Sequence, residues 1–506
     1  MRNVVRRVAM PAVFSCCGMF ALCSSGGVAR AAQPVLLPGS LVISSTTYDR
    51  TQGALASLAA GTSIPNTDMA SQPAIAGNDY VDVWENDTVD GSFGVTSEIT
   101  LTTIEPHSGH VFHTVAVPTS QVVTSFSSKS ELALHVTADA AGPHLVFVAY
   151  AGAGVGALDV SNSDAVAGQD PTNPVTFWGG TSYAFARTVV SMDGQGDFSY
   201  TPTINYGGNN GRSGLLGSNG LYYTVGNANN GNASTFGPNG TSPDVTETTG
   251  LEVVTPIDAA TSSVAIPAGN SAEVDPLVEM KFGTKLDKAG KDDNFRGITE
   301  YGGALYFTKG SGSNGVDTVY TVSSLPTVAG AASAQITIVP GFPTDSAKAT
   351  GGNFTPFAVF FANPTTMYVT DEGTGNATDV ASHAGLEKWS LGSDGKWVLD
   401  YVLTKGLIGT VDTNLNGADG PWPDVTTIGL RNLTGIVDLE GGTVTLYAAT
   451  STSSASGDNG ADPNKVVVIK DQLDATTLAG RVAKESFSVV AAPTYGTCYR
   501  GVALVP

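Results

Sequence analysis

Short runs of apolar and β-branched residues alternate along the whole chain with segments rich in Gly, Asn, Ser and Asp. Residues 40–48, 99–104, 318–322 and 397–403 are examples of such runs. Runs of this length, bounded by turn-forming residues, are typical of β-strands. The pattern therefore predicts an all-β protein made of many short strands.

One longer pattern recurs: Arg, Thr or Ser near Gly or Pro, an apolar pair, a turn, and a strand resembling Leu-Tyr-x-Thr. The clearest copy is Asn294–Ile298 followed by Ala304–Thr308. Other copies begin at Glu131, Arg212, Phe354, Leu433 and Tyr499, and matching positions lie 59 to 83 residues apart. Each interval has room for four strands, as in a blade of a β-propeller.

The last copy breaks off after a single strand, because the chain ends at Pro506. Strand-like runs at Ser40–Tyr48, Ile99–Ile104 and Val111–Val117 can supply its missing partners. A propeller needs this closure, since an open ring leaves sheet edges exposed. We therefore expect a six-bladed β-propeller of four-stranded blades, closed by pairing of the N- and C-terminal strands. Residues 183–192 and 198–205 leave seven blades as the alternative.

The first residues have the pattern of an export signal. Arg2, Arg6 and Arg7 precede the apolar run Val8–Leu22, and Ala29-Arg30-Ala31 has the form of a cleavage site. We expect residues 1–31 to be a signal peptide and residues 32–506 a single propeller domain. The predicted location is secreted or periplasmic, by the general secretory or the twin-arginine route.

Composition and charge agree with this assignment. The chain has 61 Gly, and only 14% of its residues are charged, which disfavours long surface helices. Removal of the signal leaves 20 basic against 45 acidic residues, a net charge of −25. Such a charge disfavours nucleic acid and anionic membranes as partners. Cys498 would be the one remaining cysteine, so no disulfide within the chain is expected.

Several further segments resemble those of a family of secreted bacterial β-propeller proteins. The segments are Asp90–Ser97, Phe126–Leu134, Leu158–Ser163, Gly208–Arg212 and the Phe/Tyr-Arg-Gly strands at Phe295–Gly297 and Tyr499–Gly501. The resemblance covers most of the mature chain. It implies the propeller fold and export, and it implies no activity.

Candidate catalytic residues lie in loops that a propeller gathers at one end of its central channel. Asp371 and Glu372 begin one such loop, which also contains His383. Carboxylates and a histidine in one loop are suited to general acid–base chemistry. A solvated histidine in an ordinary loop is the alternative for His383.

The segment Asp412–Gly420 resembles a calcium-binding loop. Its oxygen donors at positions one, three and five, followed by Gly at six, allow a short loop to curl around Ca²⁺. The closing Glu is missing, so Asp419 or Asp424 would have to complete the shell. The predicted ligands are Asp412, Asn414, Asn416, Asp419 and Asp424. An Asx-rich turn without a cation is the alternative.

Three arginines recur at the starts of the predicted inner strands: Arg212, Arg296 and Arg500. Guanidinium groups that converge at a channel mouth would hold a carboxylate, sulfate or phosphate of a substrate. Alternatively, each arginine pairs with an acidic neighbour such as Asp293 and joins adjacent blades.

Two classes of function follow. The first is an extracellular hydrolase that acts on a carbohydrate, an ester or a phosphorylated small substrate, assisted by calcium or a carboxylate pair. The second is a non-catalytic propeller that binds a glycan or a protein. The chain lacks the Gly-x-Ser-x-Gly, His-Glu-x-x-His and Walker motifs. In either case we expect a monomer with a small-molecule or glycan ligand.

Overall fold

The computed structural model places most of the chain after Gln33. It describes residues 34–506 except 50, 54–55, 57–58, 60, 65–73, 80–81, 85–93, 127–131, 153, 159, 164–184, 229–248, 258–265, 277, 283–291, 313, 351–353, 375–383, 412–424 and 454–461. Residues 34–506 form one compact unit. The predicted signal peptide and its cleavage site lie outside the described residues.

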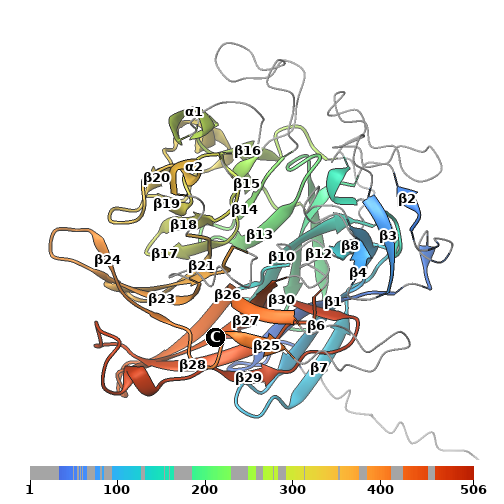
Figure 1. Ribbon diagram of the computed structural model, residues 1–506. Helices are drawn as coiled ribbons and strands as arrows, with labels where there is room; N and C mark the ends of the chain where they lie inside the picture. Colours follow the sequence, from blue (N-terminus) through green and yellow to red (C-terminus); the bar gives the residue numbers. More distant parts are fainter. Residues whose placement is uncertain are drawn as a thin grey trace, which may run out of the picture. The chain divides into compact units, whose positions relative to one another are not determined.

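Six four-stranded antiparallel sheets form a β-propeller (Figure 1). Each sheet is one blade, and the strand named first is the innermost. The closing blade is β30 (Thr497–Leu504), β1 (Leu41–Thr47), β6 (Ile99–Ile104) and β7 (Val111–Ala116). The next is β9 (His135–Asp139), β10 (Gly142–Ala151), β11 (Arg187–Asp193) and β12 (Phe198–Thr203).

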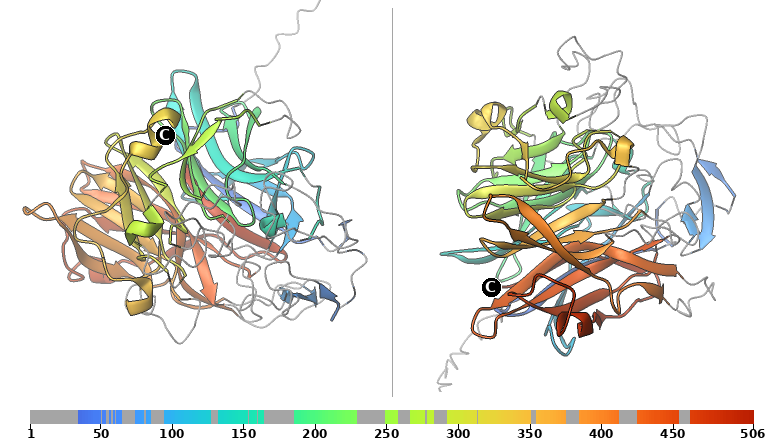
Figure 2. Two further views of the ribbon diagram at one scale, coloured as in Figure 1. Left: turned by 90° about the horizontal axis from the view of Figure 1, so that it is seen from above. Right: turned by 60° about the vertical axis from the view of Figure 1, so that its left-hand side comes forward.

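The remaining four blades follow in chain order. They are β13 (Gly211–Leu216), β14 (Tyr222–Gly226), β15 (Gly250–Val254) and β16 (Ser271–Glu273); β17 (Ile298–Tyr301), β18 (Ala304–Lys309), β19 (Thr318–Val322) and β20 (Thr337–Ile338); β21 (Pro356–Asn363), β22 (Thr366–Asp371), β23 (Gly385–Leu391) and β24 (Trp397–Leu403); and β26 (Val425–Asp438), β27 (Thr443–Ser453), β28 (Val466–Gln472) and β29 (Ser488–Ala491). In the right-hand view of Figure 2, the yellow, orange and red sheets follow one another as separate layers.

Smaller elements are attached to this frame. β8 (Val122–Phe126) pairs with the end of β10 and with β5 (Val95–Ser97), and β25 (Gly409–Val411) pairs with the start of β26. β2 (Ser63–Ile64), β3 (Ala74–Asp79) and β4 (Asp82–Trp84) form a separate sheet. The two α-helices among the described residues, α1 (Val278–Phe282) and α2 (Ala347–Thr350), are short. None of the described helices has the length and apolar character needed to cross a membrane.

The predicted closure is confirmed. The C-terminal strand β30 pairs with the N-terminal strand β1, from Leu41 opposite Leu504 to Thr47 opposite Thr497. β1 then pairs with β6, and β6 with β7. The three N-terminal strands therefore complete the blade that the C-terminal strand begins.

Six blades are confirmed, and the seven-bladed alternative is wrong. The runs that suggested a seventh blade form β11 and β12, which are the outer strands of the β9–β12 blade. The inner strands contact one another in the order β30, β9, β13, β17, β21, β26 and back to β30. The ring is therefore closed around a central channel.

The Thr of the recurring strand motif has a structural role between blades. Thr308 Oγ1 donates a hydrogen bond to the carbonyl of Phe357 at 2.7 Å, and Thr370 Oγ1 donates one to the carbonyl of Arg431 at 2.6 Å. Ser44 Oγ makes the same bond to the carbonyl of Leu132 at 2.8 Å. The first two bonds join the second strand of one blade to the inner strand of the next, and the third joins β1 to the segment that leads into β9.

A β-bulge recurs near the start of the inner strands. The strand register shifts at Arg212 in β13, at Phe357 in β21 and at Arg500 in β30, and another shift in β26 includes Arg431. A bulge redirects the side chain of the extra residue. The same backbone irregularity thus presents an arginine in three of the six blades.

A buried charged cluster joins the β21–β24 and β26–β29 blades through their outer strands. We call it the Lys388 cluster; its members are Tyr368, Lys388, Tyr401, Asp471 and Glu485. Lys388 and Asp471 are fully buried, with Nζ 3.3 Å from Oδ2. Tyr401 donates a hydrogen bond of 2.8 Å to Asp471 Oδ1, and the hydroxyl of Tyr368 also donates to Asp471. Lys388 Nζ donates to the carbonyls of residues 472 and 473 as well.

Candidate functional site

The central channel has two chemically different ends. At the loop end, the inner strands begin and the second strands finish, so residues near Arg296 and Asp371 lie there. At the hairpin end, the inner strand of five blades turns directly into its second strand, as at Gly302, whereas in the closing blade the end of β30 pairs with the start of β1. Each predicted site residue that the structure describes lies at the loop end or at the start of an inner strand.

At the loop end, Glu372 lies between two arginines from different blades. Its Oε1 is 3.0 Å from Nη1 of Arg296, and its Oε2 accepts a hydrogen bond of 3.1 Å from Nε of Arg431. All three side chains are more than nine-tenths buried. We call these three residues the Arg296 triad. It joins the β17–β20, β21–β24 and β26–β29 blades.

Arg296 retains hydrogen-bonding capacity. Its Nη2 contacts Ser311 Oγ, whereas its buried Nε has no hydrogen-bond partner among the described residues. Buried polar groups without partners are uncommon in folded proteins and require an explanation. The triad therefore has a donor group available in addition to its internal ion pairs.

Asp371, the other predicted carboxylate, is engaged by its own turn. Its Oδ2 accepts a hydrogen bond of 2.8 Å from the backbone of Thr355, and its Oδ1 accepts one of 2.8 Å from the backbone of Gly373 and another from Thr355 Oγ1. Burial raises the pKa of Asp371, although these hydrogen bonds oppose the shift. The side chain fixes the turn that carries Glu372.

The other two predicted arginines are also buried. Arg212 Nη1 donates to the carbonyl of Phe295 at 3.1 Å and to the side chain of Asn294, so it connects the β13–β16 blade to the β17–β20 blade. Arg500 lies in β30 and is 4% exposed. The structure thus brings Arg296 together with Glu372, and it engages Arg212 with a neighbouring blade.

A second ion pair lies near the triad. Lys309 Nζ is 2.7 Å from Asp317 Oδ1, and both side chains are buried. Burial lowers the pKa of Lys309 and raises the pKa of Asp317, while their mutual attraction opposes both shifts. Arg296 is close enough to act electrostatically on both groups. The loop end is therefore a dense network of buried charges.

The remaining predicted site residues lie outside the described part of the chain. These are His383 in the acid–base loop and all five expected calcium ligands, Asp412, Asn414, Asn416, Asp419 and Asp424. Among the residues that are described, no group of three or more His, Cys, Asp and Glu side chains is arranged to hold a metal ion. The calcium loop stays a prediction.

Arg431 was not predicted, although the sequence contains a signal for it. Arg431-Asn432-Leu433 occupies the inner-strand position that Arg296-Gly297-Ile298 and Arg500-Gly501-Val502 occupy in their blades. The repeat that begins at Leu433 places Gly435 where the structure has Asn432, three residues earlier. The register shift between Leu430 and Leu433 accounts for the displacement, because extra residues in a bulge break a spacing-based alignment.

Asn432 ties three inner strands together inside the channel. Its Oδ1 accepts a hydrogen bond of 2.6 Å from the backbone of Val502 and one of 3.3 Å from the backbone of Leu134. Next to it is a cavity of about 180 Å³, lined mainly by inner-strand residues such as Ile298, Val359 and Leu504. This cavity therefore lies in the interior of the channel.

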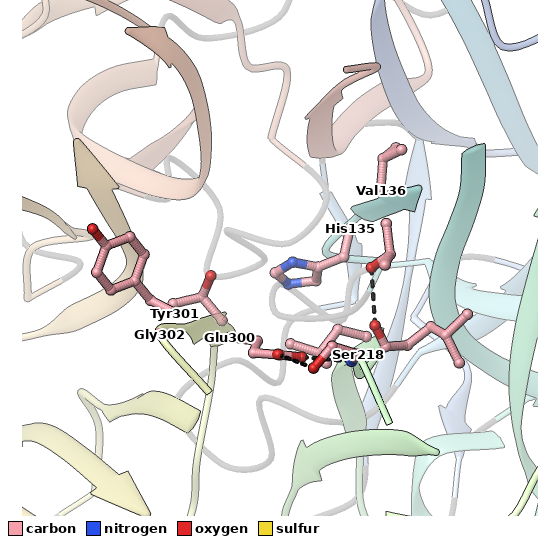
Figure 3. Close-up of a pocket in the computed structure, with 10 residues that line it drawn as sticks. His135, Val136, Ser218, Glu300, Tyr301 and Gly302 are labelled. Atoms are coloured by element: carbon pink, nitrogen blue, oxygen red, sulfur yellow. Dashed lines mark hydrogen bonds between the residues drawn. The ribbon is translucent and has the colours of Figure 1, made fainter. Parts of the chain in front are cut away.

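A larger pocket of about 310 Å³ lies at the hairpin end, between β9, β13 and β17 (Figure 3). Its lining includes His135, Ser218, Thr299 and Glu300. Glu300 accepts hydrogen bonds from Ser218, one of 2.5 Å from Oγ and one of 2.8 Å from the backbone N–H. In Figure 3 the ring of Tyr301 points away from the other labelled side chains. Sequence reasoning gave no signal for this pocket, because its residues come from three blades.

Comparisons with known proteins give no family. No protein-family model matches the chain, and no curated protein matches it in sequence. Among solved structures, a GH43 β-xylosidase/α-arabinofuranosidase from a compost microbial metagenome, in complex with xylotriose and in a calcium-free form, is 11% identical. The alignment covers 73% of this chain and 94% of that chain, with a TM-score of 0.31.

Two other solved structures show similarity of the same order. The GH43_1 enzyme from Xanthomonas citri complexed with xylotriose is 11% identical, over 72% of this chain and 89% of that chain, with a TM-score of 0.29. A Saccharomyces cerevisiae assembly containing Dbp5 bound to Nup159 is 8% identical, over 69% and 75%, with a TM-score of 0.28. At these values the similarity carries no inference about chemistry, and the fold rests on the strand pairing itself.

Proposed function

We propose that the chain is an exported hydrolase of a carbohydrate, ester or phosphorylated small substrate, and that the Arg296 triad is its reaction centre. The observation that carries the proposal is the position of Glu372 between guanidinium groups of two other blades, at the loop end of the channel. Residues from several blades meet there, as expected of a site built on a rigid propeller.

The charge of the triad supports an anionic substrate group. Two guanidinium groups face one carboxylate, and the nearby carboxyl groups of Asp371 and Asp317 are engaged by Thr355 and Gly373 and by Lys309. Within the triad the guanidinium groups outnumber the carboxylates, and the Nε–H of Arg296 has no partner among the described residues, which supports binding of a further negative group. Guanidinium forks bind carboxylate, sulfate and phosphate groups well.

The triad also supplies chemistry for hydrolysis. In the proposed reaction, Glu372 accepts a proton from water and the water oxygen bonds to the electrophilic centre. The bond from that centre to the departing oxygen breaks, and the departing oxygen takes a proton from the predicted acid–base residue His383. The buried Nε of Arg296 donates to the negative charge that develops in the transition state. Asp371 holds the turn that positions Glu372, and His383 remains the predicted acid for the departing group.

Export and calcium assistance belong to the same proposal. The basic, apolar and Ala-x-Ala segments of residues 1–31 support secretion or a periplasmic location. The loop Asp412–Gly420 supports calcium binding through the types and spacing of its oxygen donors. A chain that runs through the export pathway would encounter calcium outside the cytoplasm.

A panel of chromogenic glycosides, acetyl esters and phosphate monoesters tests the proposal. We expect the purified mature chain to hydrolyse at least one member of this panel, and we expect Glu372→Gln to lower kcat/KM by about 100-fold, as for loss of a general base. The exposed hairpin variant Glu440→Gln is the matched control, and it should retain the wild-type rate. Each assay is run once with about 2 mM calcium and once with a calcium chelator.

No turnover of any panel member, with and without calcium, would contradict the hydrolase. It would support a second candidate, a propeller that binds a glycan or other small ligand without reacting with it. One observation favours this candidate: Asp371 is almost fully buried and its oxygens accept three hydrogen bonds, so only one carboxylate of the pair is available for chemistry.

A further inference from the structure

The hairpin end of the channel contains a second candidate site, separate from the Arg296 triad. Its pocket is lined by residues of β9, β13 and β17 and by the turns that follow β13 and β17. Three of its lining positions, His135, Val136 and Thr299, also line the cavity at the middle of the channel. The pocket therefore shares part of its wall with the channel interior. Its volume of about 310 Å³ is within the range of small-molecule sites.

We infer that this pocket binds a small hydroxylated amine, such as an amino sugar, with its ammonium group at Glu300. The inference concerns residues at the opposite end of the channel from the proposed reaction centre. It goes beyond the proposed hydrolysis and does not depend on it.

The charge of the lining points to a cation. Glu300 is the only acidic residue among the lining residues described, and these include no Lys or Arg. Ser218 donates two hydrogen bonds to Glu300, one to each carboxylate oxygen, which leaves lone pairs on both oxygens for a ligand. A carboxylate with no basic neighbour in a concave site favours a positively charged ligand group and disfavours an anion.

His135 does not add a competing positive charge. Burial lowers the pKa of its imidazole to about 4, so the ring is neutral near pH 7. One ring nitrogen, Nε2, lies 3.1 Å from Ser213 Oγ. Because Nε2 is engaged by Ser213, the other nitrogen of the neutral ring can make one hydrogen bond to a hydroxyl group of a polyol.

The rim of the pocket is held in place by bonds between blades. Thr137 Oγ1 donates to the carbonyl of Leu216 at 2.9 Å, His135 contacts Ser213, and Ser218 donates to Glu300. These contacts connect β9 to β13 and the turn after β13 to β17. The polar groups are thus fixed before a ligand arrives, which lowers the entropy cost of binding.

Isothermal titration of the mature chain with glucosamine tests the inference. We expect saturable binding of about one glucosamine molecule per chain. Glucose, which lacks the charge, should bind at least about 10-fold more weakly, and glucuronate, which carries the opposite charge, should not bind. Glu300→Gln should weaken glucosamine binding by at least about 10-fold, whereas Glu440→Gln at another hairpin should leave it unchanged.

A second variant guards against an effect on folding. Thr299→Val keeps the volume of the side chain and should weaken glucosamine binding by about 3- to 10-fold without a change in the melting temperature. Equal binding of glucosamine by wild type and Glu300→Gln, or binding of glucuronate as tight as that of glucosamine, would overturn the inference. The titration measures binding without turnover, so a silent hydrolase panel does not affect its outcome.

Discussion

Two buried charged clusters join neighbouring blades, and they differ in how their charged groups are paired. The Lys388 cluster joins the β21–β24 and β26–β29 blades, and the Arg296 triad joins these two and the β17–β20 blade. In the Lys388 cluster, Asp471 accepts from two tyrosine hydroxyls and the ammonium group, and Lys388 also donates to two carbonyls. In the Arg296 triad, two guanidinium groups share one carboxylate, and Arg296 Nε has no partner among the described residues.

The difference separates a structural role from a functional one. Each cluster contains a buried polar atom without a hydrogen-bond partner among the described residues, and the two atoms differ in kind. In the Lys388 cluster it is an acceptor, Glu485 Oε2, whereas in the triad it is a donor, Arg296 Nε. An unused guanidinium donor can bind an anion, and an unused carboxyl oxygen cannot. The positions agree with this distinction. The Lys388 cluster lies away from the inner strands, and the triad lies at the loop end of the channel.

The largest expected effect on stability comes from breaking the Lys388 cluster at Asp471. Asp471→Asn removes the charge that holds Lys388 and two tyrosines, and should lower the free energy of unfolding by about 3–5 kcal/mol. Urea denaturation of the variant and of the exposed control Asp394→Asn measures the effect. If both variants unfold at the wild-type midpoint, the Lys388 cluster does not stabilise the blade interface.

The triad should respond less in stability and more to anions. Glu372→Gln keeps one acceptor for the arginines, so we expect a loss of about 1–3 kcal/mol. The two uncompensated guanidinium groups should then take up sulfate, which would raise the melting temperature of the variant more than that of the wild type. A sulfate response equal to that of Glu440→Gln would show that the triad does not attract anions.

The pH dependence of stability should also distinguish the Lys388 cluster from the Arg296 triad. Burial and the adjacent Asp471 raise the pKa of Glu485 from 4.5 to about 8. The folded state therefore holds this proton after the unfolded state has lost it, so stability from this group falls as pH rises from about 4.5 to about 8.

Glu485→Gln removes that titration. The difference in unfolding free energy between the variant and the wild type should therefore increase across the same pH range, in favour of the variant. Denaturation curves at intervals of about one pH unit, from about pH 5 to about pH 8, measure this difference. A difference that stays constant with pH would mean that Glu485 has an ordinary carboxyl environment in the folded protein.

The smallest expected effect is that of an uncharged bond between blades. Thr370→Val removes the hydroxyl that donates to the carbonyl of Arg431, and should lower stability by about 1 kcal/mol. Thermal unfolding of the Thr370→Val variant measures this loss of stability. Thr365→Val, at the exposed hairpin, is the comparison variant. An effect as large as that of Asp471→Asn would remove the distinction between charged and uncharged contacts at this interface.

Much of the propeller could be predicted from the sequence, because each blade repeats its own local chemistry. The shortened copy at Tyr499 indicated the pairing with Ser40–Tyr48 correctly, and the Thr of the strand motif proved to join successive blades. Both features depend on residue order within one repeat, which the sequence displays directly.

The candidate site was less predictable. Arg431 was missed because a bulge displaces it from the expected spacing, and the partner of Glu372 could not be identified without knowing which blades are neighbours. The hairpin-end pocket combines His135, Ser218 and Glu300 from three blades. Contacts of this kind depend on the assembled ring and leave no local pattern.

The role of Glu372 as general base is tested most directly by the kcat/KM of the mature chain and of Glu372→Gln on the best substrate of the chromogenic panel. Both proteins are compared at a temperature well below their melting points, with Glu440→Gln alongside. We expect the kcat/KM of Glu372→Gln to be about 100-fold below that of the wild type, and that of the control to equal it. A wild-type rate in Glu372→Gln, or no hydrolysis by any of the three proteins, would contradict it.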